Sequence, residues 1–228
     1  MSMSPRHPVD QVADEAEPVP ASASRRRFVR NVGLGAAALG AAAVTGTALT
    51  EVASAQTGGA TEAPDLSPAD VSLLQFLQSI SLAAEDGLTA AAEKPFLETP
   101  VLEQVRLFAR HHRAQAAAIG GLLPEADAIT EPNARLLEEI TADVDRAADQ
   151  AALLGVLLTL EEDIAATMLE GIGTAESFLV SGAAATIQPI VAQQAAAFGL
   201  ANDAPIDQWL PAFGTTDGAL SPSAYPAR

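Results

Sequence analysis

The stretch that decides the fold runs from Val101 to Ile119 and reads VLEQVRLFARHHRAQAAAI. Its inward-facing positions recur at alternating steps of four and three residues, the spacing of a helix that packs against other helices. These seam positions are Val101, Val105, Phe108, His112, Gln115, Ile119 and Leu122. An imidazole and a carboxamide therefore stand where apolar side chains are expected. The pair indicates a metal site, the reduced form of one, or a hydrogen-bonded pair in the core.

The segments on either side show the same helical period, and none reads as a strand. We expect one helix from Ser67 to about Lys94 and a second from Thr99 to about Gly121. A short crossover helix, 133–141, should run directly into a long third helix that ends at Gly171 and Gly173. A fourth helix should run from about Ala175 to Phe198. This pattern predicts an all-α fold, a four-helix bundle with a long crossover between its second and third long helices. The tail beyond is too rich in turn residues for helix, and its Trp209, Leu210 and Phe213 should pack on the bundle.

The N-terminal segment has the features of an export signal. Arg25, Arg26 and Arg27 precede a weakly apolar run, and Ala53-Ser54-Ala55 supplies a cleavage site. The paired arginines indicate the twin-arginine type. The alternative is a retained membrane anchor, which the Gly and Thr content of the run disfavours. We therefore predict a signal in 1–55, a linker in 56–66, the bundle in 67–200 and the packed tail in 201–228.

The composition restricts the cellular compartment and the binding partners that we expect. Beyond residue 55, 228 − 55 = 173 residues carry 12 − 5 = 7 basic and 29 − 5 = 24 acidic side chains. The resulting formal charge of 7 − 24 = −17 argues against nucleic acid or anionic lipid as a partner. The chain has no cysteine, which excludes disulfides and thiolate chemistry. We expect export to the periplasm, cell wall or medium, no membrane span after cleavage, and the twin-arginine translocase as a partner in transit. A homo-oligomer stays open.

Acidic and histidine side chains on the seams are the candidate metal ligands. A bundle of this connectivity holds two metal ions with Glu from two helices and Glu-x-x-His from the other two. The candidates with the strongest pattern are Glu85, His112 and Glu161; the weaker ones are Glu162, Gln115, Gln194 and His111. Each has a simpler alternative: Glu85 pairs with an arginine, and His112 bonds to Gln115, Gln194 or a glutamate. The dinuclear set lacks two carboxylates and at least one histidine.

Three stretches and the tail resemble the exported ferritin-like domain proteins. The stretches are FARHHRAQA (108–116), LEEDIAATM (160–168) and IQPIVAQQA (187–195), and the tail contains FGTTDGAL (213–220). The resemblance covers nearly all of the chain beyond the signal and implies a ferritin-like fold. The family's fourth helix reads Val-Glu-Ala-Gln-His-Ala, whose Glu falls on Val191 and whose His falls on Gln194. Both ligands of that helix are therefore replaced here.

Three functions stay open from the sequence. The leading one is an exported ferritin-like protein with a degenerate di-metal site, which is non-catalytic or binds one divalent metal, iron or another, on Glu85, His112 and Glu161. The second is a working di-iron-type oxidase or iron-sequestering protein with unconventional ligands. The third is a structural or partner-binding bundle without metal. We predict no catalytic residue and leave enzyme activity undecided.

Overall fold

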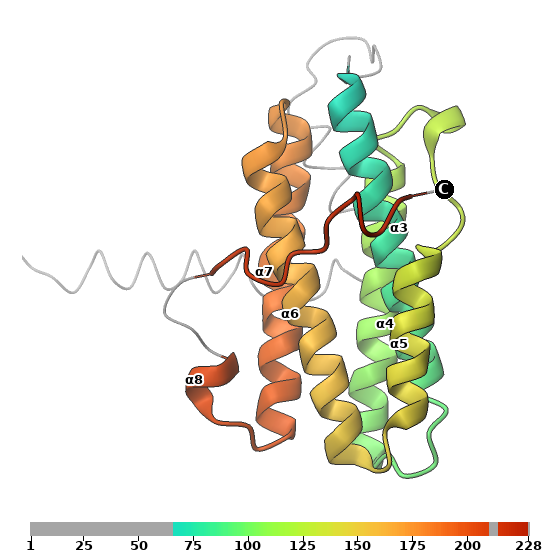
Figure 1. Ribbon diagram of the computed structural model, residues 1–228, viewed down its shortest axis with the longest axis vertical. Helices are drawn as coiled ribbons and strands as arrows, with labels where there is room; N and C mark the ends of the chain where they lie inside the picture. Colours follow the sequence, from blue (N-terminus) through green and yellow to red (C-terminus); the bar gives the residue numbers. More distant parts are fainter. Residues whose placement is uncertain (1–65, 210–213, 228) are drawn as a thin grey trace, which may run out of the picture. The chain divides into compact units, whose positions relative to one another are not determined.

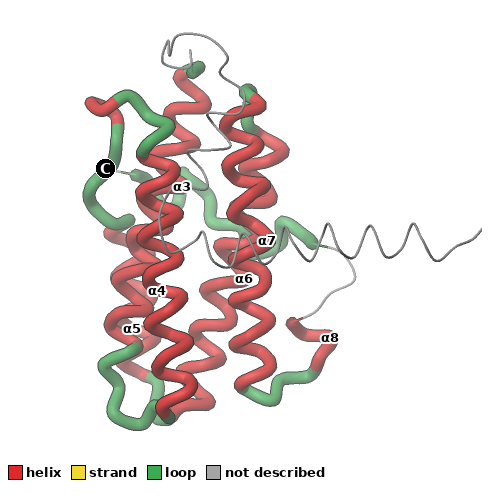
Figure 2. Tube along the Cα trace, turned by 180° about the vertical axis from the view of Figure 1, so that it is seen from behind, coloured by secondary structure: helices red, strands yellow, loops and turns green. Residues whose placement is uncertain are grey.

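The computed structural model describes residues 66–209 and 214–227, and this part of the chain is all-α. Figure 2 shows helices and loops and no strand in these ranges. The elements are α3 (Pro68–Ala91), α4 (Thr99–Gly120), the short 3₁₀ turn η1 (Glu125–Asp127), α5 (Ala134–Arg146), α6 (Gln150–Thr174), α7 (Phe178–Ala201) and the four-residue α8 (Ile206–Trp209). The predicted signal, nearly all of the predicted linker, and Leu210 and Phe213 lie outside the described residues.

Side-chain caps set the starts of the helices. Ser67 accepts a hydrogen bond from the Asp70 amide at 3.1 Å, and Pro68 takes the first turn of α3, as predicted. Ser177 caps α7 in the same way, through the amides of Leu179 and Val180. α7 lies three residues later than expected at both ends. The cap accounts for its start, because a helix begins where its first amides find an acceptor.

The segment between α4 and α6 differs from the prediction. The short helix does not run into the next one: α5 continues to Arg146, the backbone of Ala147 is extended, and Asp149 caps the start of α6. No proline or glycine marks this break, so its sequence signal is weak. Of the two glycines predicted to end the helix, Gly173 lies one residue before the end of α6 at Thr174, whereas Gly171 does not end it. That glycine is buried within the helix, where a Cβ would lie 3.5 Å from Leu77 and 3.8 Å from Ala184, so it serves close packing.

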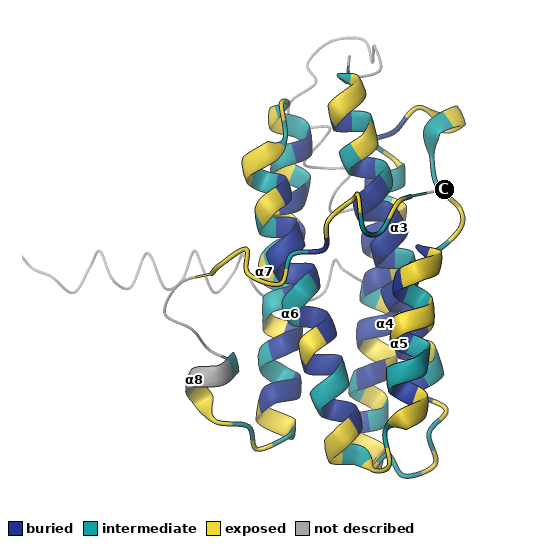
Figure 3. Ribbon diagram, in the orientation of Figure 1, coloured by how far each residue is buried: buried dark blue, intermediate teal, exposed yellow. Residues whose placement is uncertain are grey.

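The four long helices pack in two pairs. α3 lies mainly along α4, and α6 lies mainly along α7; the pairs meet where α3 contacts α6 and α4 contacts α7. α5 packs against α3 and α6 from outside these pairs, as Figure 1 shows. Burial follows the predicted seam of α4, since all of its predicted positions except Leu122 are buried. Figure 3 shows the buried positions of the described helices in dark blue, alternating with exposed positions in yellow. None of the described helices is long and apolar enough to cross a membrane.

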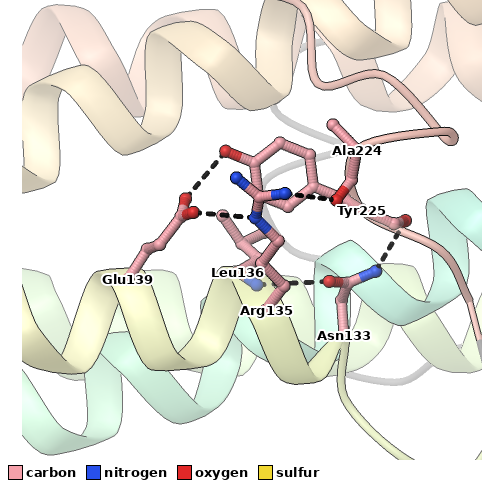
Figure 4. Close-up of polar contacts among 6 residues, drawn as sticks. All are labelled: Asn133, Arg135, Leu136, Glu139, Ala224 and Tyr225. Atoms are coloured by element: carbon pink, nitrogen blue, oxygen red, sulfur yellow. Dashed lines mark hydrogen bonds and ion pairs between the residues drawn. The ribbon is translucent and has the colours of Figure 1, made fainter.

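The tail is attached to the helices by polar contacts. The Leu220 amide donates to Thr167 Oγ1 at 2.8 Å, and the Leu220 side chain is buried. Asn133 at the start of α5 donates to the Tyr225 carbonyl at 3.0 Å, while the Tyr225 hydroxyl donates to Glu139 at 2.7 Å (Figure 4). Gly218 has a φ of 85°, and a Cβ there would lie 2.6 Å from Asp163, so both backbone and space require glycine. The tail is thus bound to α5 and α6.

Candidate functional site

A histidine and a glutamate form the polar centre of the described helices. His112 comes from the seam of α4 and Glu161 from the seam of α6, and neither side chain is exposed to solvent. His112 Nε2 lies 3.1 Å from each carboxylate oxygen of Glu161. A carboxylate can only accept here, so the imidazole proton stands on Nε2. The pair joins helices from the two different helix pairs, at a position that both seams predict to be buried.

Glu85 is held by a different partner. Its carboxylate accepts from Arg113 Nε at 2.5 Å, and Arg113 Nη2 forms an ion pair with the same oxygen. The Glu85 side chain is 9% exposed and that of Arg113 is 74% exposed, so the contact lies at the edge of the α3–α4 interface. This matches the simpler alternative for Glu85, an arginine pair. In the structure His112 therefore pairs with Glu161, whereas Glu85 pairs with Arg113.

His111 and Gln194 form a second, neighbouring contact. Gln194 Nε2 lies 2.9 Å from His111 Nδ1. Partial burial lowers the pKa of His111, and the electrostatic influence of its neighbours His112 and Arg110 lowers it further. A neutral imidazole can accept at Nδ1, so the amide of Gln194 donates. The carboxamide at the expected histidine position of α7 therefore binds His111 rather than His112.

Three buried polar atoms near these contacts have no hydrogen-bond partner among the described residues. They are His112 Nδ1, Gln115 Oε1 and Gln194 Oε1. In the neutral form of His112 with its proton on Nε2, all three atoms are acceptors, so they cannot satisfy one another. A buried acceptor without a donor costs about 1–3 kcal/mol. The centre therefore contains polar atoms beyond the His112–Glu161 pair. A hydrogen-bond donor or a cation at this place would satisfy them.

The predicted ligands do not gather into one cluster. Glu162 lies one step round α6 from Glu161 and is half-buried, and burial raises its pKa. Within residues 66–209 and 214–227, no three His, Asp or Glu side chains are arranged so that they could hold a metal ion. The sequence reasoning missed Arg113 as the partner of Glu85. Its only signal would have been the register between the antiparallel helices α3 and α4, which the sequence does not reveal.

Asp163, on α6 beside the tail, has a strongly raised pKa. Burial raises its pKa to about 6 from an ordinary value of 3.8, and the charge of Glu162 adds to this. The folded chain thus binds this proton more tightly than the unfolded chain. The resulting stabilisation is fully present below about pH 4 and is lost as the pH rises through about 6.

Asp163→Asn should therefore raise the stability at about pH 7.5 and leave it unchanged at about pH 4. A shift of about two units sets an upper limit of about 3 kcal/mol. Because the side chain is only half-buried, we expect about 1 kcal/mol, or about 2–4 °C in the melting temperature. Thermal unfolding at both pH values measures this. Asp217→Asn is the control, because Asp217 is exposed in the tail that lies beside Asp163. An equal gain in stability in this variant would contradict the assignment to Asp163.

No family model matches the sequence, and no match is found among curated proteins or among solved structures. The described residues themselves define the class: an all-α protein whose packed helices enclose a histidine–glutamate pair.

Proposed function

We propose that the chain is an exported ferritin-like four-helix bundle whose di-metal site is degenerate, and that it is not an iron-dependent oxidase. In this reading the His112–Glu161 pair is a structural contact between α4 and α6 and carries no redox chemistry. The observation that carries the proposal is the His112–Glu161 pair. Both carboxylate oxygens of Glu161 face the Nε2–H of His112. The two best candidate metal ligands of the site are therefore hydrogen-bonded to each other.

The order of the helices supports the ferritin-like part of the proposal. α3 with α4 and α6 with α7 would be the two hairpins of the bundle, and α5 would form the crossover between them. The three stretches on α4, α6 and α7 that resemble the exported ferritin-like proteins supply the seams of those helices. The tail segment that resembles the same family contains Gly218, whose positive φ accounts for the glycine in that motif.

The donor set supports the degenerate part. A dinuclear centre in this fold needs carboxylates from all four long helices and two histidines. Here α7 offers Val191 and Gln194, and the carboxylate of α3 is neutralised by Arg113. The residues present do not fit a dinuclear centre, so no oxidation step is assigned to them.

A second candidate is a single divalent cation at the same centre. The observation that favours it is the group of three unpartnered acceptors around His112, because a cation would satisfy them. For Glu85 to join His112 and Glu161 as a ligand, its carboxylate would have to leave Arg113. This candidate shares its location with the first and differs from it only in metal content.

Metal analysis of the protein isolated from cell fractions separates these candidates. We expect the protein outside the cytoplasm, with far less than one metal ion per chain, and no acceleration of Fe(II) oxidation in air. Two irons per chain, or rapid Fe(II) oxidation, would overturn the proposal. One ion per chain that is lost in His112→Leu would favour the second candidate. Recovery in the cytoplasm alone would contradict export.

A further inference from the structure

A charged cleft lies between α3 and α4, on the outside of the helix packing. Its volume is about 180 Å³. The polar residues that line it are Glu85 and Thr89 from α3, Glu93 just beyond its end, and Arg106, Arg110 and Arg113 from α4. Arg106 and Arg110 are one helical turn apart, so both guanidinium groups project from the same face of α4.

Short side chains account for the space. Ala92, just beyond the end of α3, and Ala109 of α4 are buried and form the apolar part of the lining. These two short side chains leave a hollow that longer side chains would fill. The arginines of the lining are exposed, so their charged ends stay in water.

Pairing distinguishes two of these arginines from the other cations of the described chain. Residues 66–209 and 214–227 contain six Lys or Arg side chains. Four form ion pairs with Asp or Glu: Lys94, Arg113, Arg135 and Arg146. Arg106 and Arg110 form no such ion pair with a described residue, and both line the cleft. Although the chain has a formal charge of −17, the two cations of the described ranges that lack a described carboxylate partner thus line the same cleft.

We propose that this cleft binds a small oxyanion, a carboxylate or a phosphate, between the guanidinium groups of Arg106 and Arg110. Guanidinium groups present parallel N–H donors that match the paired oxygens of both ligand types. Glu85 and Arg113 engage each other, so they leave the ligand to the other two arginines. The lining carries three positive and two negative side chains, which makes it locally positive on an acidic protein.

The size and lining of the cleft restrict the ligand further. About 180 Å³ admits a compact molecule and excludes a nucleotide or a folded peptide segment. Ala92 and Ala109 offer a small apolar floor, which suits a short aliphatic body between two carboxylates. We therefore choose succinate and inorganic phosphate as probes, because they share the oxyanion chemistry and differ in the body that carries it.

Isothermal titration of the full-length chain in a chloride buffer tests the proposal. We expect the wild-type chain to bind at least one of the two probes, and Arg106→Gln and Arg110→Gln each to weaken that binding about tenfold, since a charge-assisted hydrogen bond is lost. Arg146→Gln is the matched control: it removes the same charge from an exposed site on α5, and it should change the affinity less than twofold.

The outcomes are distinct. Binding of succinate alone identifies a carboxylate ligand, and binding of phosphate alone identifies a phosphate ligand. The absence of binding for both probes at millimolar concentration would overturn the proposal, and so would an equal loss in the Arg146 control. Circular dichroism of each variant checks that the helices are intact. Because metal is not involved in this test, its result is independent of the metal content of the polar centre.

Discussion

Glu161→Ala is expected to lower the free energy of unfolding by about 3–5 kcal/mol, the largest effect of any change at the polar centre. The reason is that the substitution leaves His112 fully buried without its partner and opens a cavity beside it. Chemical denaturation followed by circular dichroism measures the loss. The melting temperature should fall by about 2–4 °C for each kcal/mol.

The double variant His112→Leu/Glu161→Leu separates pairing from packing. It removes both members of the pair and fills much of their volume, and such replacements are often neutral or stabilising. We therefore expect the double variant to be clearly more stable than Glu161→Ala. A double variant as unstable as the single one would contradict a merely structural pair. A wild-type stability that falls on addition of a chelator would point to a bound cation instead.

Asn133→Ala is expected to cost about 2–3 kcal/mol, because one buried side chain both caps α5 and holds the tail. Its Oδ1 accepts from the Leu136 amide at 3.2 Å and caps α5, which is worth about 0.5–2 kcal/mol. Its Nδ2 donates to the Tyr225 carbonyl at 3.0 Å, and this bond attaches the tail (Figure 4). The side chain is buried, so alanine would leave these groups without partners. Thermal and chemical unfolding measure the loss.

One further variant, with a control, separates the two roles of Asn133. Asn133→Asp keeps an acceptor for the cap but turns a carboxylate oxygen toward the Tyr225 carbonyl, so it should release the tail more than it harms α5. Limited proteolysis measures release of the tail, and the helical circular dichroism signal measures loss of α5. Comparing the two distinguishes the losses. Asn202→Ala, at the C-terminal end of α7, is the control, and we expect it to cost well under 1 kcal/mol. An intact tail in Asn133→Asp would contradict this role of Nδ2.

The parts of the fold that follow local rules could be predicted. The cap at Ser67 and the proline at 68 set the start of α3, and the four-three spacing on α4 identified the buried face, including His112. The same spacing identified Glu161 as inward-facing on α6. The break at 147–149 escaped prediction because a single aspartate cap, without proline or glycine, interrupts a continuous helical pattern.

The sequence by itself determined which faces of the helices are buried, because helical periodicity acts within one segment. It placed His112 and Glu161 on those faces. Only the tertiary structure decided the partners: Glu161 meets His112, Glu85 meets Arg113, and Gln194 meets His111. The physical reason is that a contact between helices depends on their rotation and register, which many residues set together through packing. For the same reason, the cleft beside Arg106 and Arg110 has no signature in the sequence of either helix.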